Sequence, residues 1–372
     1  MGKIKVMDEN LINKIAAGEV VEKCVSVVKE LVENSIDANS ENIKVDLLES
    51  GVREIKVTDD GVGMDREDAL LAFSSHATSK LLNEDDLYSI VSLGFRGEAL
   101  PSIASVSDVI IKTSTGSVGT IVNLKGGIVV SEEKGDSRIG TIIAVKNLFY
   151  NTPARLKYLG SLYRELSNVT DYIHKVALAH PNIAFTLTND EKVIFSTDGS
   201  ENQLKVIKEI YGVETAKKMI SIKGENDDYV ISGFISYPEV TKSNRNHITT
   251  IVNGRVVRNT ELNRVINDVY HTYKPDDRYL VVVVNIEVDP TLIDVNIHPA
   301  KLDIKFGKFD TLSELATELI SDGLRKVTLI PEVKQAVKEE EVNNYEEITL
   351  GLERDVKEPE IQYEKEKIEE EI

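Results

Sequence analysis

Residues 29–38 constrain the fold more than any other stretch of this sequence. If they form a helix, at about 100° per residue, then Glu30, Asn34 and Asp37 fall at positions i, i+4 and i+7 and line one narrow face. Apolar residues such as Leu31 occupy the other faces, which predicts a helix embedded in protein. Its polar stripe must then reach water or line a pocket, because an unpaired buried carboxylate is costly. On this stretch alone, a solvated stripe is the simpler interpretation.

The composition of the chain narrows the class of protein. With 372 residues, 41% of them hydrophobic and 29% charged, the chain is long enough for two globular domains. Its single cysteine, Cys24, cannot form an internal disulfide, and no residue spacing indicates a zinc site. No apolar run approaches the length of a membrane span, and the N-terminus has no apolar signal core. We therefore expect a protein of the cytoplasm.

The formal net charge of −19 argues against nucleic-acid binding by bulk electrostatics. The charge is unevenly distributed. Residues 331–372 hold 15 acidic and 6 basic residues, which account for about half of the net negative charge. The same segment has few apolar residues, which predicts a disordered acidic linker or tail. A local basic groove elsewhere in the chain remains compatible with the acidic total.

The order of the predicted elements indicates the fold class. Helical patterns come first and strands later, without the regular alternation of a doubly wound sheet, so we predict an α+β sandwich. In the first half, strand patterns occur over 43–47, 54–58, 109–113, 120–124 and 141–145, and helical patterns over 66–73 and from 153 to about 180.

A second α+β domain is expected after a boundary near residues 200–214. Leu262, Val265, Ile266 and Val269 give a clean helical apolar face, with Thr260 as its expected N-cap. The other predicted elements are a short helix over 204–211, strands over 229–236, 249–252, 279–288, 293–297 and 302–306, and a closing amphipathic helix through residues 312–320.

Two further segments carry possible ligand chemistry. Residues 59–63, Asp-Asp-Gly-Val-Gly, follow a predicted strand. There an aspartate can accept a hydrogen bond from an exocyclic amine, and the glycines allow the backbone to approach a planar ligand. Taken alone, such a segment is more often an ordinary turn. Residues 74–100 form a long connection, and loops of that length are usually functional or disordered.

Within this long connection, residues 93–100 form a glycine-containing loop that opens a helix, so its N–H groups could cradle phosphates. The loop lacks the Gly-Lys-Ser/Thr ending of a P-loop. Residues 76–80, His-Ala-Thr-Ser-Lys, supply hydroxyls and an ammonium group nearby. An ordinary solvated loop remains an equally good interpretation of this second segment.

Taken in order, residues 30–38, 59–63 and 94–100 resemble the nucleotide-binding motifs of the GHKL ATPases, which include DNA gyrase B, the Hsp90 chaperones, histidine kinases and MutL. Residues 15–20, 76–80, 94–100, 149–155, 252–255 and 294–301 are similar specifically to the MutL family of DNA mismatch repair proteins, over roughly residues 1–330.

This resemblance implies a two-layer GHKL (Bergerat) ATP-binding α/β sandwich followed by a smaller ribosomal-S5-like α+β transducer domain. The implied domains are an N-terminal dimerisation arm (1–20), the ATPase domain (21–205) with an ATP lid at 74–100, the transducer domain (206–330) and the acidic linker or tail (331–372).

The resemblance also implies a role for individual residues, with ATP and Mg²⁺ as cofactors. Glu30 would be the general base for the attacking water, and Lys301 would reach the γ-phosphate from the second domain. Asn34 would be the protein ligand of Mg²⁺, and Asp59 would hold the adenine amino group. The implied cofactor-binding residues are Asn34, Asp37, Asp59, Gly61, Gly63, Thr78, Ser79, Lys80, Gly94, Phe95, Arg96, Gly97, Glu98, Ala99, Leu100 and Thr141.

The function implied is that of an ATP-gated DNA clamp and matchmaker in mismatch repair, located in the bacterial cytosol and associated with the nucleoid. Its implied partners are a second copy of the chain, the mismatch-recognition protein MutS, other repair factors, and DNA bound with little or no sequence specificity. A basic groove for DNA would use Arg155, Lys157, Arg164, Arg245, Arg255, Arg258 and Arg264, with Lys242 and His247 beside them.

Two departures from the family pattern limit what is implied. Cys24 stands where the family commonly has a small residue or proline. The chain also stops in the linker, so we expect no C-terminal endonuclease domain in it. A binding module that uses ATP only to clamp DNA, or an Hsp90-like chaperone ATPase, would share the same pocket and remain alternatives.

Overall fold

The structure is a computed structural model of the chain, and it describes residues 17–18, 20–80, 92–94, 97–243, 245–275, 278–294 and 304–328. The N-terminal arm up to residue 16, the middle of the expected lid, Lys301 and the acidic tail lie outside these ranges. Among the helices of the described ranges, none combines the length and the apolar character needed to span a membrane.

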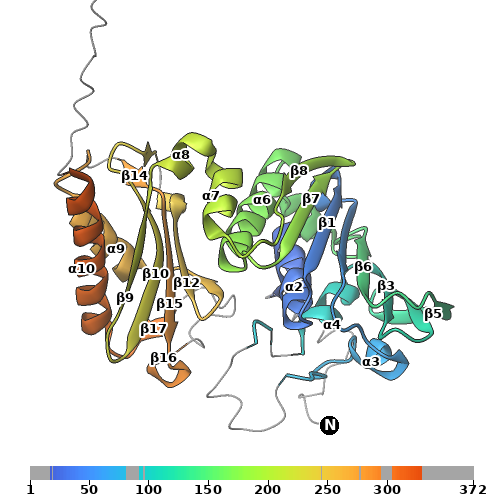
Figure 1. Cartoon of the computed structure of the whole chain (residues 1–372). Coiled ribbons are helices and arrows are strands. Elements are labelled where there is room, and N and C mark those ends of the chain that lie inside the picture. The colour runs from blue at the N-terminus through green and yellow to red at the C-terminus, as the bar shows by residue number, and fades with distance from the viewer. Residues whose placement is uncertain are drawn as a thin grey trace, which may run out of the picture. The chain divides into compact units, whose positions relative to one another are not determined.

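The first domain is built on a mixed sheet of eight strands in the order β5-β4-β3-β6-β2-β1-β7-β8 (Figure 1). Strands β1 and β2 pair antiparallel, and β1 pairs parallel with β7. The bounds of the strands are β1 Asn42–Leu48, β2 Glu54–Asp59, β3 Asp108–Ser114, β4 Gly119–Lys125, β5 Ile128–Gly135, β6 Gly140–Lys146, β7 Ala184–Asn189 and β8 Lys192–Ser196.

Helices pack on one face of this sheet because its strands alternate in burial. In β1, for example, Ile43, Val45 and Leu47 are buried while their neighbours are more exposed. These residues share one core with Val28 and Leu31 of α2. The helical elements of this half are α2 Cys24–Asp37, η1 Glu49–Gly51, α3 Arg66–Leu71, α4 Ala99–Ser105, α5 Pro153–Tyr158, α6 Leu162–Ala179, α7 Gln203–Tyr211 and α8 Val213–Lys217.

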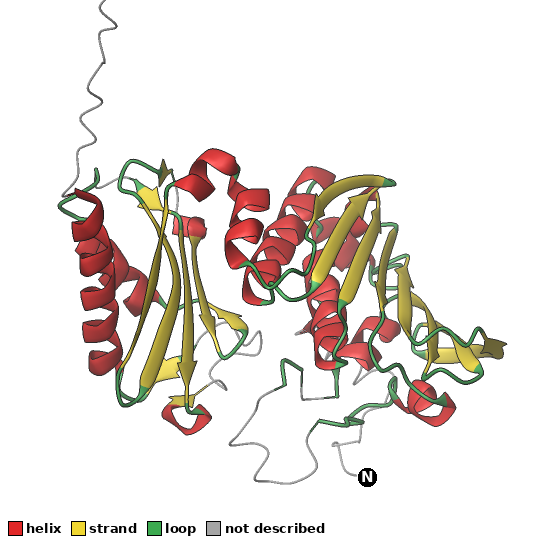
Figure 2. Cartoon of the chain, in the orientation of Figure 1, coloured by secondary structure: helices red, strands yellow, loops and turns green. Residues whose placement is uncertain are grey.

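The second domain has its own core around a five-stranded sheet in the order β13-β12-β15-β10-β9. Helices α9 and α10 lie against one face of it (Figure 2). The bounds are β9 Met219–Glu225, β10 Tyr229–Ser236, β11 Thr241–Lys242, η3 Arg245–His247, β12 Ile248–Val252, β13 Arg255–Val257, α9 Thr260–Tyr270, β14 Tyr279–Leu280, β15 Val282–Val288, η4 Pro290–Leu292, β16 Ile293–Asp294, β17 Lys305–Phe306 and α10 Phe309–Thr328.

The predicted α+β class is confirmed, and so are the predicted strands at the centre of each sheet. The long helix expected from 153 to about 180 is wrong, because it is broken into α5 and α6. Gly160 lies in the break, and the Ser161 side chain accepts a hydrogen bond from the N–H of Arg164, which caps a new helix. The strand expected over 279–288 is likewise divided, into β14 and β15.

The expected N-cap of α9 is also wrong by one residue. Asn259 accepts a hydrogen bond from the N–H of Leu262 at 2.7 Å, while Thr260 is the first helical residue. The apolar face is partly as predicted, since Leu262 and Ile266 are fully buried. Strands β5, β7, β8, β9, β11 and β13 were not predicted. Three of them, β5, β8 and β9, contain exposed apolar or charged residues at an edge of their sheet, which obscures the alternation that marks a half-buried strand.

Candidate functional site

Helix α2 presents the predicted polar stripe beside the end of β2. Glu30, Asn34 and Asp37 are all partly buried on this helix. Among the residues that the structure describes, none forms a hydrogen bond or an ion pair with the carboxylate of Glu30. Asn34 and Asp37, by contrast, both bind the same side chain, that of Lys80.

The ammonium of Lys80 lies 2.9 Å from Oδ1 of Asn34 and 2.5 Å from Oδ2 of Asp37. Lys80 is therefore held by an amide oxygen and a carboxylate oxygen, which are also the ligands that a hard divalent cation prefers. The side chain of Asp37 is only 9% exposed, so this is a shielded ion pair rather than a surface one. The geometry creates a small cation-binding corner on α2.

Asp37 also fixes the backbone of residues 92–94. Its two carboxylate oxygens accept hydrogen bonds from the N–H groups of Leu93, at 2.9 Å, and Gly94, at 3.0 Å. On the other side of this segment, Nη2 of Arg255 donates to the carbonyl oxygens of Ser92, at 2.9 Å, and Leu93, at 3.3 Å. Segment 92–94 is thus held by residues from both domains.

Asp59 ends β2 and is buried, with 5% of its surface exposed. Its Oδ1 accepts hydrogen bonds from the N–H groups of Gly61, at 3.0 Å, and Thr141, at 3.1 Å, and its Oδ2 accepts one from the hydroxyl of Ser35, at 2.9 Å. Burial raises the pKa of Asp59, although these three donors act in the opposite direction. Since Oδ2 accepts only the Ser35 hydroxyl among the described residues, it retains capacity for a further donor.

The turn after Asp59 is packed too closely for larger residues. A Cβ atom at Gly61 would lie 2.7 Å from the carbonyl oxygen of Ala38, and one at Gly63 would lie 2.0 Å from that of Ser114. Gly63 also has a φ of +69°, which favours glycine. The glycines thus allow close packing within the protein, and the predicted close approach to a ligand stays a prediction.

The two ends of the long 74–100 connection meet. The N–H of His76 donates to the carbonyl oxygen of Gly97 at 3.1 Å, and a Cβ at Gly97 would lie 2.4 Å from the carbonyl oxygen of Ala77. Thr78 accepts a hydrogen bond from the N–H of Lys80, and Ser79 is exposed. Glu98 precedes α4, which begins with Ala99 and Leu100. Phe95 and Arg96 lie outside the described residues.

The residues predicted to bind DNA do not form one exposed group. Lys157, Arg164, Arg258 and Arg264 are exposed, and Arg264 lies 3.9 Å from Asp268.

Arg155 and Arg255 are both placed away from an open groove. Arg155 packs against Gly18, where a Cβ atom would come within 2.3 Å of its Nη2, and its Nη1 is buried. Arg255 is 9% exposed and bound to segment 92–94. This placement does not favour a contact of Arg255 with DNA, which stays a prediction. The side chain of Arg245 is outside the described part of the structure.

Two features of the site were not predicted. Ser35, the partner of Asp59, is buried one residue after Asn34, and its only signal is a small hydroxyl residue on the inner side of α2. The contact of Arg255 with segment 92–94 joins positions more than 160 residues apart, so no local pattern reveals it. Burial lowers the pKa of Arg255, while nearby Glu33, Asp37 and Glu30 act to raise it.

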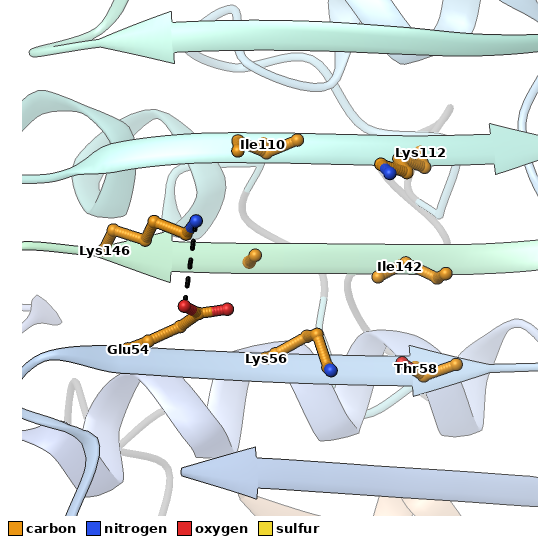
Figure 3. Close-up of a pocket in the computed structure, with 8 residues that line it drawn as sticks. Glu54, Lys56, Thr58, Ile110, Lys112, Ile142 and Lys146 are labelled. Atoms are coloured by element: carbon orange, nitrogen blue, oxygen red, sulfur yellow. Dashed lines mark ion pairs between the residues drawn. The ribbon is translucent and has the colours of Figure 1, made fainter. Parts of the chain in front are cut away.

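A separate shallow hollow lies on the sheet face of β2, β6 and β3 (Figure 3). Glu54 and Lys146 form an ion pair of 3.7 Å at its edge. None of the predicted site residues lines it, so it is a different surface from the corner on α2. Its lining residues are Glu54, Lys56, Thr58, Ile110, Lys112, Ile142, Ala144 and Lys146.

Family models match both domains of the chain. Residues 22–146 match the model described as "Histidine kinase-, DNA gyrase B-, and HSP90-like ATPase", and residues 207–325 match "DNA mismatch repair protein, C-terminal domain". A protein of Geobacillus sp. (strain WCH70) named "DNA mismatch repair protein MutL" is 52% identical over 360 residues, which is 96% of this chain and 58% of that protein.

The chain belongs to the MutL family. A MutL of Bacillus mycoides (strain KBAB4) is 48% identical over 342 residues, covering 92% of this chain and 53% of the relative. The chain thus spans between half and three fifths of the length of these MutL relatives.

Solved structures agree on the fold of this MutL region. The N-terminal domain of a DNA repair protein superposes with a TM-score of 0.72 at 25% identity, over 86% of this chain and 99% of that one. The Aquifex aeolicus MutL ATPase domain complexed with ADP superposes with a TM-score of 0.57 at 24% identity, over 80% of this chain and 98% of that one. The expected GHKL-type α+β architecture is therefore confirmed.

Proposed function

We propose that this MutL-family chain binds ATP with Mg²⁺ in the site around α2 and hydrolyses it to ADP and phosphate. The observation that carries the proposal is the cation corner: Asn34 and Asp37 already hold the ammonium of Lys80, beside the fixed N–H groups of segment 92–94. A charge arrangement of this kind suits a triphosphate and its metal ion. The Aquifex aeolicus relative, which was solved with ADP, supports the same ligand class.

The base end of the site is assigned to Asp59. Its buried Oδ2, already bonded to Ser35, would accept the exocyclic amine of adenine. Thr141 and Gly61 hold Oδ1 from the backbone and so fix the orientation of the carboxylate. This arrangement favours adenine over hypoxanthine, which has a carbonyl at the same position.

The phosphate end is assigned to Asn34, Lys80 and segment 92–94. The donor set fits Mg²⁺, because Asn34 offers a neutral oxygen now occupied by a positive ammonium, and Mg²⁺ usually keeps several waters and phosphate oxygens as ligands. Bound there, Mg²⁺ would neutralise charge on the phosphates. Lys80, which lies beside Asn34, would supply a positive charge to the phosphate oxygens. Lys301 remains a further proposed contact of the γ-phosphate.

Glu30 is assigned as the general base that orients the attacking water and accepts its proton. Its carboxylate lies one turn before Asn34 on the same face of α2, so a water near the metal site is within its reach. Among the described residues, no ion pair occupies the carboxylate of Glu30, so it can accept a hydrogen bond from that water. The remaining MutL roles, as an ATP-gated DNA clamp that pairs with a second copy and with MutS, are proposed on the basis of family membership.

The experiment is Glu30→Ala in the full chain, followed by ATP-binding titration and single-turnover hydrolysis. We expect a loss of about 100-fold or more in the hydrolysis rate, since general-base catalysis typically contributes about 10²–10⁴-fold. ATP affinity should stay within about threefold, because Glu30 contacts water rather than nucleotide. Glu22→Ala, an exposed carboxylate before α2, is the matched control. Hydrolysis at the unmodified rate by Glu30→Ala would overturn the assignment.

A pure binding module, which uses ATP only to close on DNA, is the second candidate. The carboxylate of Glu30, which has no ion-pair partner in the part of the chain that the structure describes, favours hydrolysis over this alternative. Single-turnover hydrolysis measured with and without double-stranded DNA separates the two. No detectable ADP in either condition, with ATP still bound, would favour the binding module.

A further inference from the structure

We infer that Arg255 is a positioning residue that fixes segment 92–94 to the second domain and so couples the placement of that domain to the phosphate end of the ATP site. The inference rests on the proposed function of the site. It adds Arg255 to that site, as the connection between the second domain and segment 92–94. It starts from the two hydrogen bonds of Arg255, to the carbonyl oxygens of Ser92 and Leu93.

Both main-chain polar groups of Leu93 are hydrogen-bonded. Its N–H donates to Asp37 in the first domain, and its carbonyl oxygen accepts from Arg255 in the second. Gly94 follows directly and donates to the same carboxylate of Asp37. Since Asp37 also binds Lys80, a shift of Leu93 alters the surroundings of a proposed phosphate-binding ammonium within two contacts.

The hairpin that carries Arg255 is rigid. Strands β12 and β13 are joined by Asn253 and Gly254, both with positive φ, in the two-residue turn that matches the twist of a hairpin. The amide of Asn253 exchanges two hydrogen bonds with the backbone of Val288, at 2.8 and 3.0 Å. The backbone of Arg255 is therefore fixed to the central strand β15 and moves with the sheet of the second domain.

A second set of hydrogen bonds joins the two domains at another point, through Gln203. Gln203 on α7 and Asn285 on β15 exchange side-chain hydrogen bonds of 3.2 and 3.0 Å. Gln203 also donates to the carbonyl oxygen of Leu178 on α6, at 2.7 Å. A rotation of the second domain about this point would displace Arg255 and pull on segment 92–94.

Because Arg255 is buried, its guanidinium interacts with protein groups rather than with water. Arg255 is 9% exposed and lies close to the acidic residues of α2, so its charge is matched there and not by water. Its removal leaves the carbonyl oxygens of Ser92 and Leu93 without this donor, while the hydrogen bonds from the segment to Asp37 remain.

The test is hydrogen–deuterium exchange of the nucleotide-free full chain, compared between the parent and Arg255→Met. Methionine keeps much of the apolar stem and removes the donors. We expect exchange of the Leu93 and Gly94 amides to become about tenfold faster or more, while the amides of β15 stay within about twofold. Arg53→Met, at an exposed arginine directly before β2, is the control and should change neither. Arg255→Lys should restore part of the protection, because an ammonium can still reach one carbonyl.

Steady-state kinetics supply the second readout. Arg255→Met should raise the KM for ATP by about fivefold or more with kcat within about twofold, because the segment it holds binds phosphates and does not touch the attacking water. Unchanged exchange at Leu93 and Gly94 in folded Arg255→Met, or a loss of kcat without a change in KM, would overturn the inference. If the parent chain binds no ATP, the proposed function fails, while the exchange measurement still decides the role of Arg255.

Discussion

At the scale of single residues, the site depends on carboxylates that the fold places in different surroundings. Glu30 is partly buried without an ion-pair partner among the described residues, Asp37 binds Lys80 and two N–H groups, and Asp59 is buried with three neutral donors. These surroundings match three roles, a base, an organiser of the phosphate end and an acceptor for the nucleobase. The polar stripe on α2 predicted the positions of Glu30 and Asp37. The partners and the burial of each carboxylate distinguish the three roles.

Asp59→Asn tests the nucleobase assignment. We expect ATP affinity to fall about 10- to 100-fold, since a hydrogen bond to a charged group contributes about 1.5–3 kcal/mol. Inosine triphosphate, which has a carbonyl in place of the exocyclic amine, should lose no affinity in the variant, because the amide of asparagine can donate to that carbonyl. Titration calorimetry with both nucleotides measures this. An equal loss of affinity for both would show that the substitution damages the pocket generally.

Asp59 should also leave a signature in the pH dependence of stability. Burial raises its folded pKa above the usual value near 3.8, so between that value and the folded pKa the native chain binds more protons at this residue than the unfolded chain. Stability contributed by this residue is therefore present below the unfolded pKa and is lost as the pH rises through the folded pKa. Urea unfolding at pH values from about 4 upward should show the parent losing stability relative to Asp59→Asn, and a parallel pair of curves would contradict this.

Cys24, a departure from the family pattern, is buried and unreactive at neutral pH. The residue is buried at the start of α2, and burial together with the neighbouring Glu165 raises the pKa of its thiol to about 12. The thiol is therefore protonated at neutral pH and acts as a small apolar residue.

At the scale of elements, periodicity predicted the strands and helices that are buried on one face, such as β1, β2, β10 and α9. It failed where an edge strand exposes apolar residues, as in β5, and where a local cap decides the boundary, as at Ser161 and Asn259. The site was predictable where its residues are close in sequence, as on α2. Contacts such as Arg255 with Ser92 depend on tertiary packing, which local patterns do not encode.

The corrected cap of α9 is directly testable. Asn259→Ala removes the acceptor for the N–H of Leu262 and the donor to the carbonyl oxygen of Ile304, so the free energy of unfolding should fall by about 1–2 kcal/mol. Thr260→Ala, at an exposed position of the same turn, should stay within about 0.5 kcal/mol. Denaturant unfolding of the two variants gives both values. A larger effect at Thr260 would restore it as the cap.

At the scale of the whole molecule, the two domains meet through polar contacts, between Arg255 and segment 92–94 and between Gln203 and Asn285, and through apolar residues of the second domain, such as Ile251 and Val283, that pack in the core of the first. The polar contacts at segment 92–94 connect the proposed ATP site to the second domain, as a nucleotide-gated clamp requires. We therefore expect the chain to sediment as a monomer with ADP and as a dimer with a non-hydrolysable ATP analogue. Monomers under both conditions would contradict ATP-gated pairing.

The central claim is that the corner formed by α2, Asp59 and segment 92–94 is an ATP site. Titration calorimetry of ATP into the full chain, with and without Mg²⁺, tests it most directly. We predict one ATP bound per chain, tighter binding with Mg²⁺ than without it, and competition by ADP. No heat of binding at millimolar ATP in either buffer, from a chain shown to be folded, would contradict the account.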